Sequence, residues 1–165
     1  MCEEVKQIVS KINWECQLKT QFNKDNLSLK KNVIQSINWF FNNVEMGIIL
    51  EDDCLPSQSF FPFCEELLLK YRDDFRIWHI SANFFSMQEN KGRVGDDYFF
   101  GGIYGSIWGW ATWRSRWVKY DLEMKSYTKD SRATLKRCAY GGGPAVESRL
   151  QDFDLVKNGY NTWDF

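Results

Sequence analysis

The sequence lacks the features of a secreted or membrane-spanning protein. Its five cysteines, an odd number, include no CxxC pair, and the N-terminus has no apolar signal core. Free thiols in a reducing cytosol are therefore expected. No apolar stretch approaches the roughly 20 residues that a membrane-spanning helix needs. We expect a cytoplasmic protein, and any association with an inner membrane would be peripheral.

The chain also lacks an excess of charge of either sign. With 21 basic and 22 acidic residues its formal net charge is -1, and no long run of one sign occurs. This balance argues against a nucleic-acid-binding protein that relies on a basic surface. The motifs GxGxxG and GxxxxGK[ST] are absent too, so the three glycines at 141–143 do not indicate a phosphate loop.

Apolar and aromatic residues are abundant enough to form one core. With 165 residues, 44% hydrophobic and 17% aromatic, the chain is expected to form a single domain spanning residues 1–165. The spacing of apolar residues predicts helices at 3–12, 27–44, 57–71 and 145–157, and strands at 16–22, 47–50 and 76–81. This succession predicts an α/β fold in which a mainly parallel sheet lies between helical layers.

Three consecutive carboxylates follow the strand predicted at residues 47–50. Glu51, Asp52 and Asp53 lie where the chain must turn, because Pro56 cannot continue a central strand. Ligands of parallel sheets gather at the carboxyl ends of strands. Mg²⁺ or Mn²⁺ binds carboxylate oxygens there and keeps substrate phosphates as further ligands. The triplet therefore predicts a divalent-metal site, and the alternative is an ordinary solvated loop.

Tryptophan and glycine are concentrated in residues 101–117, which contain four of each. Flat indole faces beside closely approaching backbone suit the binding of sugar rings. The alternative is that these indoles only cover an edge of the sheet. His79, the only histidine, lies within the strand predicted at 76–81 and is interpreted as a packed or hydrogen-bonded core residue.

Five segments occur in a defined order. This order indicates a protein family more specifically than any one of the segments does. They are NLSLKK (26–31), INWFF (37–41), GIILEDDCLPSQSFFPFCEELL (47–68), IWGWATWRSRW (107–117) and TWDF (162–165). Together they resemble bacterial nucleotide-diphospho-sugar transferases of the GT-A fold, a Rossmann-like sheet flanked by helices. The chain is also similar, more distantly, to the β-1,2-N-acetylglucosaminyltransferase that initiates complex N-glycans in eukaryotes.

This resemblance implies transfer of a sugar from a nucleotide-diphosphate donor, most readily a UDP-sugar, to a hydroxyl of a carbohydrate acceptor. It implies an inverting mechanism assisted by Mn²⁺ or Mg²⁺. Carried over by position, it assigns the metal to Asp53, the donor to Glu51, Asp52, Asn26 and Lys31, the sugar and acceptor pocket to Trp108, Gly109 and Trp110, and the general base to Asp164. If Asp164 is the base, Trp163 is expected to be buried as its anchor.

The chain departs from the family pattern at both ends. Relatives begin with a further strand and continue beyond the WD pair, so we expect a truncated domain without the usual first strand that tends to form homo-oligomers. One alternative is a non-catalytic remnant that binds a carbohydrate or a protein partner. Another is a metal-dependent phosphohydrolase, which the absence of a second histidine disfavours.

Overall fold

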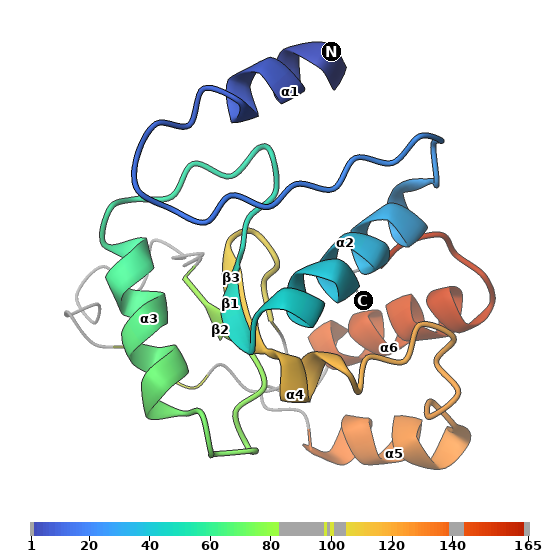
Figure 1. The fold of residues 1–165 in the computed structure, drawn as a ribbon. Helices are drawn as coiled ribbons and strands as arrows, with labels where there is room; N and C mark the ends of the chain where they lie inside the picture. Colours follow the sequence, from blue (N-terminus) through green and yellow to red (C-terminus); the bar gives the residue numbers. More distant parts are fainter. Residues whose placement is uncertain (1, 83–97, 99, 101–104, 139–143, 164–165) are drawn as a thin grey trace.

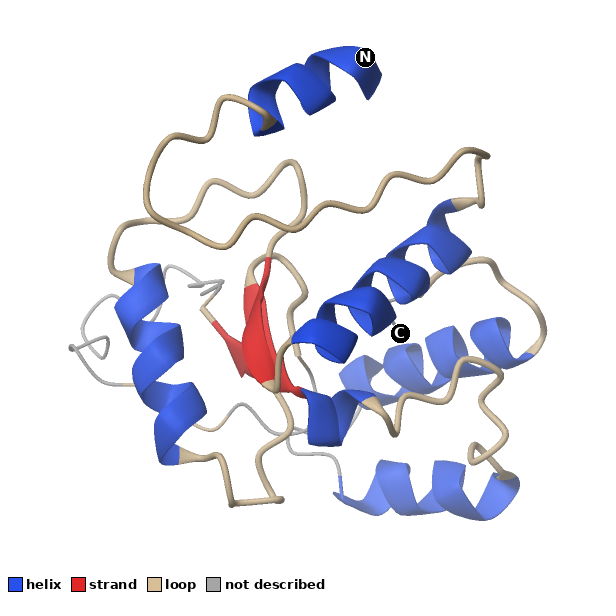
Figure 2. Ribbon diagram, viewed as in Figure 1, coloured by secondary structure: helices blue, strands red, loops and turns tan. Residues whose placement is uncertain are grey.

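The structure, a computed structural model, describes residues 2–82, 98, 100, 105–138 and 144–163. The helices are α1 (Cys2–Val9), α2 (Leu29–Asn43), α3 (Phe60–Lys70), α4 (Arg114–Trp117), α5 (Lys129–Cys138) and α6 (Pro144–Lys157). The strands are β1 (Met46–Ile49), β2 (Ile80–Ser81) and β3 (Trp110–Trp113). Figures 1 and 2 show the small sheet between α2 and α3, with α1 at the outside of the molecule. The predicted mixed α/β class is confirmed.

The sheet has the order β1-β3-β2, and β3 is antiparallel to both of its neighbours. β1 and β2 therefore run in the same direction and are connected through α3, as the sequence predicted. Among the described strands, however, both hydrogen-bonded pairs are antiparallel. These strands therefore do not form the mainly parallel sheet that was expected. The reason is β3, which the sequence pattern did not reveal because all four of its residues are buried and show no polar alternation.

The side chains of β3 alternate between two apolar clusters, as the pleat of a strand requires. Ala111 and Trp113 pack against α3, in a cluster that includes Cys64 and Leu68. Trp110 packs on the opposite side, in a cluster formed mainly by α2. The apolar residues of both helices recur at helical spacing, which explains why each helix buries one face on the sheet. The result is three layers, helix on sheet on helix (Figure 1).

A buried arginine in α4 fixes the turn that follows α3. Arg116 is only 4% exposed, and the rings of Phe75 and Trp113 lie 4.2 and 4.3 Å from its guanidinium carbon. Its guanidinium donates hydrogen bonds of 2.9–3.3 Å to the backbone carbonyl oxygens of Tyr71, Arg72, Asp74 and Ile77. These carbonyls lie beyond the last turn of α3, where intrahelical donors run out. Arg116 therefore ties together four carbonyls of this turn, two of which, those of Tyr71 and Asp74, also accept a backbone N–H.

The segment before α2 is mostly exposed. Residues 16–22, expected as a strand, form no strand, and the structure shows them as an extended loop in which Lys19 donates a hydrogen bond of 2.7 Å to Asn43. Alternating apolar residues form a strand only where a neighbouring strand accepts their backbone hydrogen bonds. Among the described cysteines, Cys16, Cys54 and Cys64 are free. In the described part of the chain, no helix is long and apolar enough to cross a bilayer.

Candidate functional site

The acidic triplet follows β1 after one residue, Leu50, in a turn at the carboxyl end of the strand. The backbone N–H of Cys54 donates to the carbonyl of Glu51 over 3.1 Å, which closes this turn. Asp52 and Asp53 are exposed, whereas Glu51 is half-buried and its Oε1 atom is shielded from solvent. The predicted position of the triplet is therefore confirmed. Two carboxylates point into water, and the third lies partly within the protein.

Three segments that are distant in the sequence meet beside this turn. Ile49, the last residue of β1, pairs across the sheet with Trp110. The ring of Trp163 lies 6.4 Å from that of Trp110, at an interplanar angle of 29°. The acidic turn, the tryptophan segment and the C-terminal segment that contains the WD pair thus share one part of the molecule.

Trp163 is held firmly within the core. It is 7% exposed, and the Tyr120 hydroxyl donates to its carbonyl oxygen over 2.8 Å. The expectation that Trp163 is buried is therefore confirmed. Asp164, the predicted general base, lies outside the described residues. The residue before it, Trp163, is anchored by Tyr120 and contacts Trp110 of β3, the strand that pairs with β1.

The three residues predicted to line the sugar pocket differ in their exposure. Trp110 is 5% exposed and stacks on His79 with ring centroids 4.9 Å apart and an interplanar angle of 8°. Trp108 is 54% exposed. A buried indole offers no open face to a ligand, so of these two tryptophans only Trp108 has an exposed ring. Trp110 is part of the core.

Gly109 turns the chain between these two indoles. Its φ of +77° lies in the left-handed region, which glycine enters without the penalty that a Cβ brings. A Cβ at this position would meet Leu50 and Phe60 at 3.4 Å. The glycine thus lets the backbone pass close to Leu50, the residue after β1.

The two residues predicted to contact the donor at the start of α2 are both exposed. Asn26 accepts the backbone N–H of Ser28 over 3.0 Å and so shapes the turn that precedes the helix. Lys31 lies in the first turn of α2. In the described part of the chain, neither residue forms a hydrogen bond or ion pair with Asp52 or Asp53. Their roles toward a donor stay predictions.

His79 is a core residue, as the sequence indicated. Its Nε2 atom donates to the carbonyl oxygen of Ser106 over 2.9 Å, and burial lowers the pKa of the imidazole despite this hydrogen bond. A neutral, stacked ring is therefore favoured at neutral pH. Sequence reasoning missed that His79 packs on Trp110, because only the pairing of β2 with β3 brings the two together.

The chemistry of the acidic turn fits a hard divalent cation. Carboxylate oxygens are the ligands that Mg²⁺ and Mn²⁺ prefer, and one or two of them suffice when substrate phosphates complete the coordination. Within the described ranges no cluster of three or more His, Cys, Asp or Glu side chains is arranged to hold a metal by itself. A cation at this turn would therefore need further ligands from outside these side chains, such as water or a phosphate oxygen.

No family model, curated protein or solved structure matches this chain. The resemblance to nucleotide-diphospho-sugar transferases thus rests on the five motifs and on where the fold places them.

Proposed function

We propose that the chain is a metal-dependent glycosyltransferase domain of GT-A type that transfers a sugar from a nucleotide diphosphate to a hydroxyl, with inversion. The observation that carries this proposal is the meeting of three motifs. Ile49 before the acidic triplet pairs with Trp110, and Trp110 contacts Trp163, which precedes Asp164. Residues separated by more than a hundred positions in the sequence are thereby gathered at one end of the sheet. Three layers, and two strands of the same direction joined through α3, are also compatible with a GT-A fold.

Each residue type suits one part of this reaction. Asp53, exposed at the turn, would hold the cation together with the donor diphosphate, and Glu51 and Asp52 would serve the ribose or support the cation site. A bound divalent ion offsets the negative charge that develops on the leaving diphosphate. The exposed face of Trp108 would cover the sugar ring. Asp164 would accept the proton of the attacking hydroxyl, a role that contributes about 10²–10⁴-fold.

The metal and donor assignments are tested together by calorimetric titration of UDP with and without Mn²⁺. Asp53→Asn removes the charge but keeps the size of the side chain, so Mn²⁺-dependent UDP affinity should fall by about tenfold or more. Asp73→Asn, at another exposed aspartate, is the matched control and should bind as the parent does. Equal Mn²⁺-dependent affinity in Asp53→Asn and the parent would overturn the donor-site assignment.

The base is tested separately from donor binding. Asp164→Asn should lower the rate of sugar transfer by about 10²-fold or more while leaving UDP affinity nearly unchanged, as expected when an interaction made only in the transition state is removed. A loss of UDP affinity instead would show that Asp164 acts in donor binding. Undiminished transfer would exclude it as the base.

One observation favours the second candidate, a remnant that binds a carbohydrate or another chain without turnover. β1 is an outer strand of the described sheet, and an outer strand offers backbone donors and acceptors for pairing. Such a remnant would self-associate and would bind carbohydrate without transferring it. Light scattering that reports a monomer, together with measurable sugar transfer, would reject this candidate.

A further inference from the structure

A pair of hydrogen-bonded tyrosines lies at the end of α3, the opposite end of that helix from the acidic turn (Figure 1). The Lys70 ammonium donates a hydrogen bond to the Tyr98 hydroxyl over 2.6 Å, and the Tyr71 and Tyr98 hydroxyls lie 2.7 Å apart. Lys70 is the last residue of α3, and Tyr71 follows it. Tyr98 is 37% exposed, so a reagent in solution can reach this residue.

Ring packing fixes this arrangement. The rings of Tyr71, Tyr98 and Phe100 contact one another edge to face, with centroids 6.0–6.3 Å apart and interplanar angles of 75–82°. Aromatic pairs prefer this geometry to a face-to-face stack. The three rings therefore keep the Tyr98 hydroxyl beside the two groups that can donate to it.

Both hydrogen bonds run toward Tyr98. An ammonium group has donors only, so Lys70 makes the Tyr98 oxygen an acceptor, and Tyr71 becomes the second donor. Hydrogen bonds to the charged form of a group favour that form. Lys70 and then Tyr71 lower the pKa of Tyr98 below its ordinary value, whereas the hydrogen bond to Tyr98 raises the pKa of Tyr71. Of the two tyrosines, Tyr98 is thus the one prepared to lose its proton.

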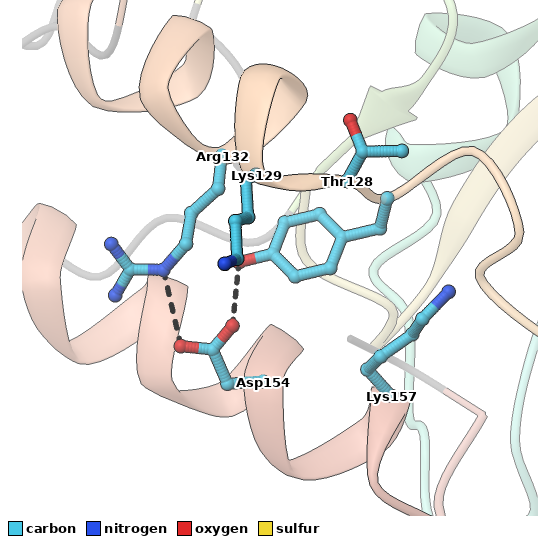
Figure 3. Close-up of a pocket in the computed structure, with 6 residues that line it drawn as sticks. Thr128, Lys129, Arg132, Asp154 and Lys157 are labelled. Atoms are coloured by element: carbon cyan, nitrogen blue, oxygen red, sulfur yellow. Dashed lines mark hydrogen bonds and ion pairs between the residues drawn. The ribbon is translucent and has the colours of Figure 1, made fainter.

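Tyr127 has the opposite arrangement, in the pocket between α5 and α6 (Figure 3). Its hydroxyl donates to Asp154 over 3.0 Å. Burial and this hydrogen bond raise the pKa of Tyr127. A carboxylate partner retains the proton of a phenol, whereas an ammonium partner favours its loss. The ammonium partner therefore distinguishes Tyr98 from a tyrosine that is merely hydrogen-bonded.

We propose that Tyr98 is a modification site whose oxygen accepts an acyl group from an activated ester or thioester. The Tyr98 oxygen bonds to the carbonyl carbon, and the bond from that carbon to the leaving oxygen or sulfur breaks with its electron pair. The phenol proton passes through solvent to the leaving group. Lys70 and Tyr71 are positioning residues that stabilise the attacking phenolate.

The charges around Tyr98 favour a neutral electrophile. The carboxylate of Glu66 acts electrostatically on Tyr98, and that of Asp74 acts on Tyr71. Both would repel a phosphoryl dianion, but they do not repel an uncharged carbonyl group. The proposal is independent of the transferase reaction, because it uses no residue of the acidic turn or of the tryptophan segment.

The test is reaction with p-nitrophenyl acetate, followed by mass spectrometry of the peptides that contain tyrosine. Tyr160 is the internal reference, because it is 56% exposed and exposure alone would make it react faster than Tyr98. We expect Tyr98 to be acetylated about fivefold faster than Tyr160, the effect of one charge interaction in water. Neutral hydroxylamine should remove this acetyl group, as it does from a tyrosine ester but not from a lysine amide.

Four variants separate the charge of Lys70 from a general effect of substitution. Lys70→Gln should slow acetylation of Tyr98 to the rate of Tyr160, whereas Lys70→Arg keeps the charge and the donors and should retain most of the rate. Glu66→Gln removes a carboxylate that disfavours the phenolate, so it should increase the rate. Lys125→Gln, at an exposed lysine that pairs with Glu123, is the matched control and should react as the parent does.

Three outcomes would overturn the proposal. The first is acetylation of Tyr98 that is no faster than that of Tyr160 in the parent. The second is an acetyl group that resists hydroxylamine and lies on Lys70 in place of Tyr98. The third is a rate in Lys70→Gln that equals the parent rate, or a loss in Lys125→Gln as large as that in Lys70→Gln.

Discussion

The two faces of β3 carry the same type of side chain in different surroundings. Trp113, on the α3 face, donates its indole N–H to the carbonyl of Leu68 over 3.0 Å and is 2% exposed. Trp110, on the α2 face, is equally buried, but its indole N–H has no hydrogen-bond partner among the described residues. The tryptophan of β3 on the α3 face is therefore hydrogen-bonded, whereas the one on the α2 face is held by ring contacts with His79, Trp117 and Trp163.

This difference separates a structural face from the face that supports the candidate site. Trp113 and Arg116 satisfy carbonyl groups at the end of α3, a task required of any stable helix that ends inside a protein. Trp110 instead links the end of β1 to Trp163, and so positions the two segments that carry the predicted metal ligand and base. A buried polar group without a hydrogen-bond partner in a native core often marks a functional region.

The largest effect is expected for Arg116→Ala on the α3 face. The substitution removes a hydrogen bond from each of four backbone carbonyls, of which those of Tyr71 and Asp74 keep a backbone donor, and it empties the space between two aromatic rings. The free energy of unfolding should fall by about 3–5 kcal/mol, as for other buried charged networks that lose one member. Urea denaturation measures this change.

The matched control for this substitution is Arg76→Ala. Arg76 is exposed and pairs with Asp74, so its removal should change the free energy of unfolding far less than Arg116→Ala does. If the two variants unfold at the same urea concentration, the hydrogen bonds of Arg116 do not hold the turn after α3.

The next effect compares the two tryptophans directly. Trp113→Phe removes a donor and leaves the Leu68 carbonyl unsatisfied in the core, which should cost about 1–3 kcal/mol beyond the lost packing. Trp110→Phe removes an N–H that has no partner among the described residues, so only packing is lost. Thermal unfolding of the two variants measures the difference. If both variants lose the same stability, the hydrogen bond of Trp113 does not distinguish it from Trp110.

A smaller loss is expected at Gly109, where the α2 face meets the acidic turn. Gly109→Ala places a side chain at a φ of +77°, which costs about 1–2 kcal/mol, and adds contacts with Leu50 and Phe60. Gly159→Ala is the control, because φ there is +98° and the added Cβ meets nothing within 4 Å. Because both sites carry the backbone strain and 3.4 Å is an ordinary contact distance, chemical denaturation should show losses of similar size in the two variants. A much larger loss for Gly109→Ala would mean that Leu50 and Phe60 cannot accommodate the added side chain.

Local patterns predicted the elements that flank the site. The helices expected at 27–44, 57–71 and 145–157 are α2, α3 and α6 with ends shifted by at most three residues, and the strand expected at 47–50 is β1. Each has an apolar pattern that matches its own period, which is why sequence alone reveals it. The acidic turn was predicted with them, since it follows directly from the end of β1.

Long-range pairing could not be predicted in the same way. β3 consists of four buried residues with no polar alternation, and it becomes a strand only because β1 and β2 pair with it on either side. The stacking of His79 on Trp110 and the burial of Arg116 depend on that pairing. Helix α5 was missed because it is polar and shows no apolar stripe that predicts a helix.

The smallest expected effect is the response of the α2 face to acid. Burial lowers the pKa of His79 below its ordinary value of 6.5, so the unfolded chain takes up a proton before the folded chain does. The contribution of His79 is therefore fully present above about pH 6.5 and is lost as the pH falls through the folded pKa. Because His79 is the only histidine, no other histidine contributes to this change.

His79→Phe keeps an aromatic ring against Trp110 but cannot titrate. Urea denaturation between pH 7.5 and 5.5 should show the parent losing stability as the pH falls while His79→Phe stays nearly flat, whatever its absolute stability. Parallel slopes in the two proteins would mean that the ring on the α2 face already accommodates a proton. The contrast between Trp113, which is hydrogen-bonded, and Trp110, which is held by ring contacts, would then lose its support from pH.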